Sequence, residues 1–355
     1  MRKSFIKQLA YLSITICVVG LVPSRAFAWG GTGHRTVAEI AVWRLQKLKA
    51  ANALRQIEQL LKSKPTTIEE ASVWPDTIRG NPVYQYTTNL HWVSIPKEKE
   101  RFDRATQCKP TAQVPEGDCV IGALEHFRKV LSDSSASTAA RLDALSFIVH
   151  FIGDLHQPLH ATEDVTFQNY NGQTGDAGGN LKIIFYLNEG IWADSDEASC
   201  TRDIEACSYI DFQGARRKRN LHAAWDSYLI ETMLAGIKVK NEKKCTKEES
   251  FKLREQRYTE NLERTISKLS SQEIARMELG EPSLWAEEAH ALATEYVYCL
   301  PPPRRKLNVA DQKIYDHYFL SQSYQAANIK RIDAQLMRAG IRLAAYLMQI
   351  FPDTP

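Results

Sequence analysis

The stretch VHFIGDLHQPLH, from Val149 to His160, places three of the nine histidines and one aspartate within twelve residues. Apolar residues at three- and four-residue steps run into it and predict a helix. His150 and Asp154 lie four residues apart, so both side chains share one face of that helix. Pro158 ends the helix and lets the following loop bring His160 back towards it. The stretch predicts a helix that carries clustered polar ligands.

A second stretch, NLHAAWD, repeats the spacing with His222 and Asp226. One such pair is ordinarily a hydrogen bond on a helix face. Two pairs together with His160 favour a metal site, because imidazole nitrogen and carboxylate oxygen are suitable zinc ligands at a spacing that leaves the helix undistorted.

Helical periodicity dominates the rest of the chain, and no linker or internal repeat divides it. The fold class predicted is all-α, with one small β-hairpin over Leu181–Asp194 around Asn188-Glu189-Gly190. The predicted helices cover Val37–Leu48, Ala51–Leu61, Val120–Leu131, Ala139–Phe151, Leu221–Leu234, Ser250–Leu269, Leu284–Tyr298 and Gln312–Ile350.

Residues 1–28 have the three parts of a secretory signal peptide: a basic start, an apolar run and the small residues Ala26 and Ala28. A membrane anchor is the alternative, but the run is short for a bilayer span and is interrupted by Ser13 and Thr15. We therefore expect cleavage between Ala28 and Trp29 and a secreted or periplasmic protein.

Removing the signal takes away four basic residues and no acidic one, so 45 basic against 42 acidic residues becomes 41 against 42. The mature chain is near neutral and lacks a global basic field for polyanions, so any attraction to nucleic acid is local. The basic run Arg216–Arg219 is interpreted as a solvated turn, with phosphate contact as the alternative.

Six cysteines remain after cleavage, an even number that suggests disulfides in an exported chain. Close spacing favours Cys108–Cys119 and Cys200–Cys207, which leaves Cys245–Cys299. A thiolate metal site is the weaker alternative, because no CxxC pair occurs.

Further stretches complete a known pattern, and the chain resembles the S1/P1 nucleases over nearly all of its mature length. These stretches are WPDTIR (74–79), LHW (90–92), GDAGGN (175–180), WAEEAH (285–290) and GIRLAAYL (340–347). The resemblance implies a multi-helix phospholipase C/P1 nuclease-like single domain over residues 29–355. It also implies three zinc ions in a cleft.

The resemblance implies a ligand set for each zinc. One zinc takes Asp76, His91, His150 and Asp154; a second takes His160, His222 and Asp226; a third takes the amino group and carbonyl oxygen of Trp29, together with His34 and the shared Asp154. Cleavage before Trp29 creates a ligand, because a free amine coordinates where an amide cannot. A buried aromatic anchor is the other interpretation of Trp29, and both hold together. Gly30, Gly31 and Gly33 are expected to fold the backbone back tightly.

The implied activity is endonuclease and 3′-nucleotidase hydrolysis of single-stranded DNA and RNA to 5′-phosphate products through a zinc-activated hydroxide. The residues assigned to catalysis are Asp154, shared by two zincs, and Arg79, suited to holding charge on the phosphate. A surface ion pair is the alternative role of Arg79. The partners expected are single-stranded nucleic acids and nucleotides, with no stable membrane association and a monomeric state.

Several residues are expected to support the site without binding metal. His156 is interpreted as a supporting contact or helix-end packing, and Asp176 and Asn180 as groups that orient imidazoles or form a turn. Tyr170 is a candidate stacking platform for a base. Many eukaryotic members have an acid shortly after the His91 position, where this chain has Ser94 and Pro96, so no general base is assigned.

Two other functions compete with this interpretation. A zinc-dependent phospholipase C would have the same fold and the same kind of metal site. It would benefit from an exposed apolar surface around the site for docking on a membrane, whereas the loops beside the histidines are polar. A zinc-stabilised binding protein would close every coordination position and favour cysteine. Three ions held by histidine, aspartate and a terminal amine favour catalysis.

Overall fold

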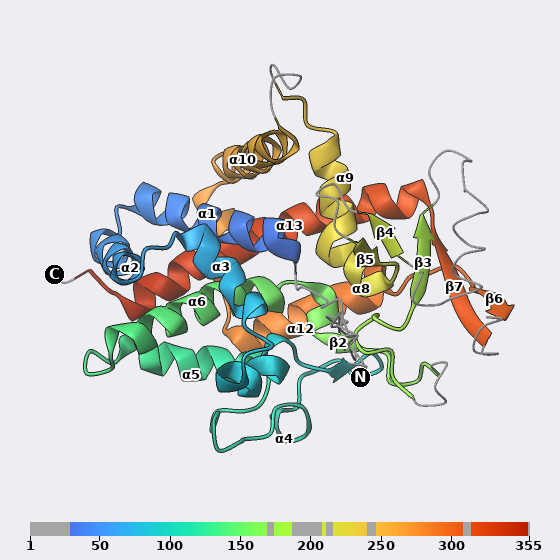
Figure 1. Ribbon diagram of the computed structural model, residues 1–355, viewed down its shortest axis with the longest axis horizontal. Helices are drawn as coiled ribbons and strands as arrows, with labels where there is room; N and C mark the ends of the chain where they lie inside the picture. Colours follow the sequence, from blue (N-terminus) through green and yellow to red (C-terminus); the bar gives the residue numbers. More distant parts are fainter. Residues whose placement is uncertain are drawn as a thin grey trace, which may run out of the picture.

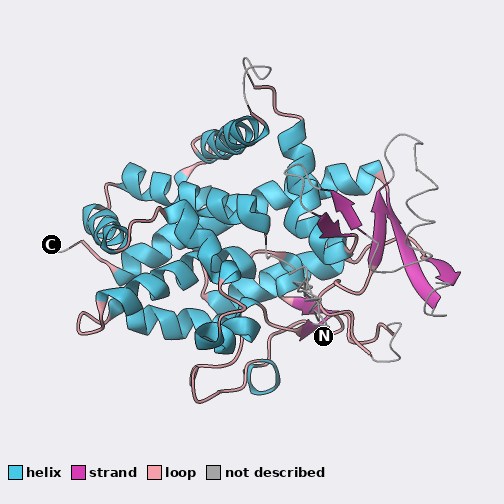
Figure 2. Ribbon diagram, in the orientation of Figure 1, coloured by secondary structure: helices cyan, strands magenta, loops and turns pink. Residues whose placement is uncertain are grey.

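The computed structural model describes residues 29–168, 174–186, 208–210, 216–239, 246–307 and 314–353. Helices form most of it, and the short strands gather at one end (Figure 2). The predicted all-α class is therefore confirmed. The predicted signal peptide, Tyr170, Cys200–Cys207 and Cys245 lie outside the described residues.

The helix α6 (Thr138–Leu155) runs through the core, and every residue from Ala144 to Leu155 is buried. A helix that is apolar on all sides is stable only when other helices surround it. α5 (Val120–Ser132) and α3 (Ile68–Thr77) pack against it, as does α2 (Ala51–Ser63) (Figure 1). This central position fixes the place of His150 and Asp154.

The first and last long helices pack side by side across α6. α1 (Gly30–Leu48) lies along α13 (Gln322–Ile350), and both contact α6 (Figure 1). A Cβ at Gly340 would lie 2.6 Å from the Ile40 Cβ, so only glycine permits this close approach. The remaining helical segments are α4 (Arg104–Gln107), α8 (Leu221–Ala223), α9 (Leu229–Ala235), α10 (Lys247–Ile266), α11 (Ser271–Glu278) and α12 (Pro282–Leu292), with 3₁₀ segments η1 (Pro82–His91) and η2 (Pro158–His160) and π-helical turns η4 (Ala224–Tyr228) and η6 (Ala293–Val297).

The strands within the described residues form three small sheets. In the largest, the order is β3-β7-β6, with β3 (Ile183–Tyr186) parallel and β6 (Arg304–Leu307) antiparallel to β7 (Ile314–Leu320). β1 (Ile95–Pro96) pairs in parallel with β2 (Thr162–Glu163). β4 (Ser208–Ile210) pairs antiparallel with β5 (Arg216–Lys218).

Two predictions in this region need correction. The helix predicted over Gln312–Ile350 begins only at Gln322, because residues 314–320 form β7, in which Tyr315 and His317 point into the core and Asp316 does not. The partner of Ile183–Tyr186 in the described residues is β7 rather than the second half of a hairpin. The turn Asn188–Gly190 and the rest of the predicted hairpin lie outside the described residues.

The Cys108–Cys119 disulfide is confirmed, and it joins the end of α4 to the start of α5. Cys299 is exposed, and its predicted partner is among the residues that are not described. None of the described helices is long and apolar enough to cross a membrane.

Candidate active site

Five side chains from four elements meet at the middle of α6, and we call them the inner group. His150 and Asp154 come from α6, His34 from the first turn of α1, Asp76 from the end of α3 and His91 from the end of η1. Asp76 is 3% exposed and the other four are fully buried. Residues separated by more than a hundred positions in the sequence thus form one polar cluster inside the helical core.

The Asp154 carboxylate lies at the centre of the inner group. Its Oδ2 is 2.9 Å from His91 Nδ1 and 3.2 Å from His150 Nε2, and its Oδ1 is 3.3 Å from His34 Nε2. A Cβ at Gly153 would lie 2.7 Å from His34 Nδ1, so this glycine lets the His34 ring pack against α6. The ring also stacks on His150 with centroids 3.8 Å apart.

Asp76 and Arg79 close the other side of the inner group. Asp76 Oδ1 lies 3.7 Å from His150 Nε2 and 3.1 Å from Arg79 Nη2. The Arg79 Nε–H donates to His91 Nε2 at 3.3 Å. The predicted ion-pair role of Arg79 is therefore present, and the same side chain also lines the cavity described below.

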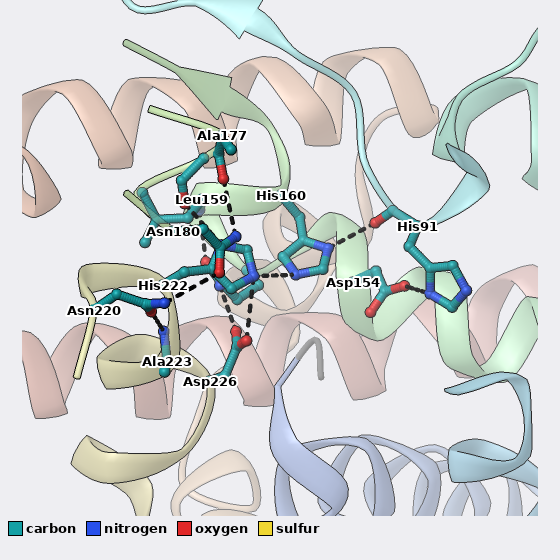
Figure 3. Close-up of polar contacts among 12 residues, drawn as sticks. His91, Asp154, Leu159, His160, Ala177, Asn180, Asn220, His222, Ala223 and Asp226 are labelled. Carbon is teal, nitrogen blue, oxygen red and sulfur yellow. Dashed lines mark hydrogen bonds and ion pairs between the residues drawn. The ribbon is translucent and has the colours of Figure 1, made fainter. Parts of the chain in front are cut away.

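A second cluster, the outer group, consists of His160, His222 and Asp226. The two Nε2 atoms lie 3.1 Å apart, and Asp226 Oδ2 lies 3.2 Å from His222 Nε2 (Figure 3). His160 is 3% exposed, Asp226 2% and His222 6%. The π-helical turn η4 contains Asp226, and such turns are often found at functional sites.

Backbone carbonyls orient both outer imidazoles. His160 Nδ1–H donates to the His91 carbonyl and His222 Nδ1–H to the Gly178 carbonyl, each at 2.7 Å. His150 is held in the same way by the Ser72 carbonyl, also at 2.7 Å. With its proton on Nδ1, each of these rings presents the lone pair of Nε2.

This arrangement fits a bound cation. The two Nε2 lone pairs of the outer group face each other without an intervening donor, which is unfavourable unless a proton or cation lies between them. Buried ligand atoms without a hydrogen bond include one carboxylate oxygen each of Asp76, Asp154 and Asp226 and both ring nitrogens of His34. Imidazole and carboxylate together are the donor set of a zinc site.

The pKa shifts follow burial and charge. Burial lowers the pKa of His160 to about 4 and also lowers that of His34. Burial would likewise lower the pKa of His222, but the neighbouring Asp226 carboxylate raises it. Burial would raise the pKa of Asp154, but the His150, His34 and His91 rings hold it well below its usual range.

A cavity of about 300 Å³ opens beside the outer group, which is within the size range of small-molecule sites. Its wall includes Arg79, Trp92, Ser94 and Glu163, together with His160 and His222. Glu163 is the carboxylate that lines this cavity within the described chain.

Trp29 is fully buried, as expected for an anchor, and its φ of 26° is unusual for a bulky residue. The predicted tight reversal at Gly30, Gly31 and Gly33 is wrong, because α1 begins at Gly30 and all three glycines are helical. At Gly30 and Gly33, close packing leaves no room for a side chain. A Cβ at Gly30 would lie 2.6 Å from Ser227 Oγ, and one at Gly33 would lie 2.7 Å from Trp29 Cβ.

The structure distinguishes between the alternative roles of the residues predicted to support the site. His156 packs at the end of α6, where its Nε2 accepts from Arg342 Nη1 at 3.0 Å, so the helix-end interpretation holds. Asp176 Oδ1 accepts from the Asp164 N–H, and Asn180 Nδ2 donates to the Ala177 carbonyl. It is the Gly178 carbonyl of the same turn that contacts an imidazole.

Three sets of these side chains lie close enough to hold an ion. Within the described residues they are His34, His150 and Asp154; Asp76, His91 and His150; and His160, His222 and Asp226. The S1/P1 nuclease family model matches residues 29–190 and 207–352, which is most of the chain.

The chain belongs to the S1/P1 nuclease family. Members of this family are zinc-dependent. Endonuclease 4 of Arabidopsis thaliana is 28% identical over 93% of this chain and 91% of its own length. Nuclease P1 of Penicillium citrinum is 24% identical over 91% of this chain and 97% of its own length. Nuclease S1 of Aspergillus oryzae is 28% identical over 46% of this chain and 50% of its own length.

The sequence did not reveal every residue that builds the site. The carbonyls of Ser72, His91 and Gly178 have no signature in their side chains, because any residue supplies a carbonyl. The glycine-rich GDAGGN stretch was the available signal for Gly178. Gln157 also contacts the outer group, and its residue type gave no signal for that contact.

Proposed function

We propose that this member of the family is a zinc-dependent nuclease that hydrolyses phosphodiester bonds in single-stranded DNA and RNA. The products are 5′-phosphates, and 3′-nucleotidase activity accompanies the endonuclease. The observation that carries the proposal is the outer group, with two imidazole Nε2 atoms 3.1 Å apart beside a cavity in a chain of this family. Lipid-headgroup cleavage is not favoured, because the relatives are named as nucleases.

We propose the three zinc sites implied by the family resemblance. The ligands are Asp76, His91, His150 and Asp154 for one zinc; His160, His222 and Asp226 for another; and Trp29, His34 and Asp154 for the third. The burial of these side chains and the carboxylate oxygens left without hydrogen bonds support this assignment. When bound, zinc supplies Lewis-acid chemistry that lowers the pKa of water and offsets charge on phosphate oxygens.

The chain's own residues then bind and orient the substrate. Arg79, at the cavity wall, presents a cation to the phosphate oxygens as their charge increases. Asp154 holds His34, His91 and His150 in one arrangement and so fixes the inner ligands relative to one another. A cavity of about 300 Å³ admits an unpaired nucleotide more readily than a stacked base pair.

We further propose that residues 1–28 are a signal peptide and that residues 29–355 form one catalytic domain, secreted or periplasmic and monomeric. Removal of the signal would leave Trp29 with a free amino group. The next residue, Gly30, packs against Ser227, and Gly33, beside the proposed ligand His34, packs against the Trp29 Cβ.

The first experiment uses protein whose N-terminus is Trp29, with single-stranded DNA as substrate, in the presence and absence of a zinc chelator. We expect chelator-sensitive release of 5′-nucleotides. A matched protein with one alanine before Trp29 should bind one zinc fewer and lose activity. Three bound zincs without nucleotide release would overturn the nuclease assignment, and phosphatidylcholine would then be tested.

A further inference from the structure

Gln157 follows the C-terminal end of α6, is fully buried and forms a hydrogen bond with Asp226. Its Nε2 donates to Asp226 Oδ1 at 2.6 Å, while its Oε1 accepts from the Leu159 N–H at 2.6 Å. The second bond fixes the orientation of the amide, because a flipped amide would turn its NH₂ group towards another N–H. Gln157 is therefore held with its donor towards the carboxylate.

This bond divides the two oxygens of Asp226 between two roles. Oδ1 is occupied by the amide, whereas Oδ2 has no hydrogen bond and lies 3.2 Å from His222 Nε2. The donor is neutral, so the carboxylate keeps its full negative charge. A lysine or arginine at this position would offset that charge and weaken attraction to a cation.

Gln157 also joins the outer group to α6, the helix that carries His150 and Asp154 of the inner group. Its backbone N–H donates to the Asp154 carbonyl at 2.9 Å, and its carbonyl accepts from the His160 N–H at 2.9 Å. One residue thus contacts Asp226 through its side chain and lies between Asp154 and His160 in the chain. Asp226 itself lies on the π-helical turn of another segment, so this side-chain bond connects the two halves of the outer group.

We propose that Gln157 is a positioning residue that holds Asp226 Oδ2 towards His160 and His222 and thereby sets the metal affinity of the outer group. This inference rests on the proposed function, in which the outer group binds zinc. Groups that hydrogen-bond a metal ligand typically change metal affinity by about 10–100-fold when they are removed.

The test compares Gln157→Met with Gln335→Met, a matched control. Gln335 is also buried, at 1% exposure, and donates from Nε2 to the His156 carbonyl at 3.0 Å without touching either group. Both changes remove a buried amide and keep the length of the side chain. Zinc affinity is measured by competition with a chromophoric chelator, and ligand geometry by the visible absorption of the cobalt-substituted protein.

We expect Gln157→Met to bind one of its ions about 10–100-fold more weakly and to change the cobalt spectrum. Gln157→Glu places a second carboxylate against Asp226 and is expected to change both readings as well. Gln335→Met should match the unmodified protein in both. Equal zinc affinities in Gln157→Met and the unmodified protein, or equal losses in the two Met variants, would overturn the inference.

Two further variants separate this inference from the proposed function. His222→Ala and Asp226→Asn should each bind one zinc fewer than the unmodified protein. If neither loses an ion, the outer group is not a metal site and the proposed function fails with it. If both lose an ion while Gln157→Met binds zinc normally, only the role of Gln157 is wrong.

Discussion

The inner and outer groups use the same two kinds of side chain but are held in different ways. In the inner group the ligands contact one another, since Asp154 alone touches His34, His91 and His150. In the outer group the imidazoles are held by carbonyls outside the group and line an open cavity. The inner group is thus cross-linked through one shared carboxylate, whereas each imidazole of the outer group is oriented by a carbonyl and lines the cavity.

This difference indicates a division of roles between the two groups. A cluster whose members depend on one shared carboxylate should fail as a unit when that carboxylate changes. A group whose imidazoles are each oriented by a separate carbonyl should lose one ion when a ligand changes and leave the rest of the protein intact. The following experiments test this contrast.

The largest effect is expected from Asp154→Asn. The change removes a charge that three imidazoles share, so we expect loss of two zinc ions and a fall in nuclease activity of about 1,000-fold or more. Mass spectrometry measures the number of bound zinc ions, and release of nucleotides measures the activity. Asp143→Asn on the same helix is the control, because Asp143 accepts from the Tyr84 hydroxyl and touches neither group. Loss of a single ion in Asp154→Asn would contradict the shared role.

His222→Ala should have the next largest effect. We expect loss of one ion and a fall in activity of about 100-fold, because only His160 and Asp226 remain to hold the ion and a zinc site ordinarily needs at least three protein ligands. The midpoint of thermal unfolding should fall less than in Asp154→Asn. Equal losses of zinc and of thermal stability in the two variants would show that the groups are not independent.

The metal-free protein should lose stability as the pH falls below about 6.5. Burial lowers the pKa of five rings, so in this range the unfolded state binds protons that the folded state does not. These rings are His34, His91, His156, His160 and His290. The raised pKa values of His150, His222 and Asp76 offset part of the effect, because these groups bind protons when folded.

Each net proton should contribute about 1.4 kcal/mol per pH unit, and the loss should continue towards the His160 pKa of about 4. This pH dependence of the free energy of unfolding is measured by urea unfolding at several pH values, after a chelator has removed the metal. Stability that rises as the pH falls from 6.5 to 5 would contradict the prediction.

The smallest effect on the metal groups is expected from His156→Leu. Its Nε2 accepts from the buried Arg342, and losing this acceptor should lower the free energy of unfolding by about 1–3 kcal/mol. Zinc content should not change. His126→Leu, at a half-buried histidine paired with Glu116, should cost less. A loss of zinc in His156→Leu would place His156 in the metal-binding machinery.

Short-range patterns in the sequence predicted much of this site. The spacing of His150 and Asp154 reflects the geometry of one α-helical turn and needs no tertiary information. The same spacing of His222 and Asp226 runs from α8 into the π-helical turn η4. Asp76 and His34 had no such pattern and were assigned only through the family resemblance. Their contacts depend on how α1 and α3 cross α6, which local periodicity does not encode.

Local patterns failed where tertiary context decides the conformation. Residues 314–320 alternate in burial and pair with two strands, but their aromatic residues also fit a helical pattern that continues into α13. The role of Gln157 could not be read from its residue type, because a buried amide is informative only once its partners are known. The three glycines at the start of α1 looked like a turn, but at Gly30 and Gly33 a small residue is required by close packing.

The packing of α1 along α13 also determines when the enzyme can be assembled. His34 is held on α1, and α1 packs against α13, a helix that is synthesised long after it. The inner ligands therefore lack this support until α13 has been made, however early the other helices form.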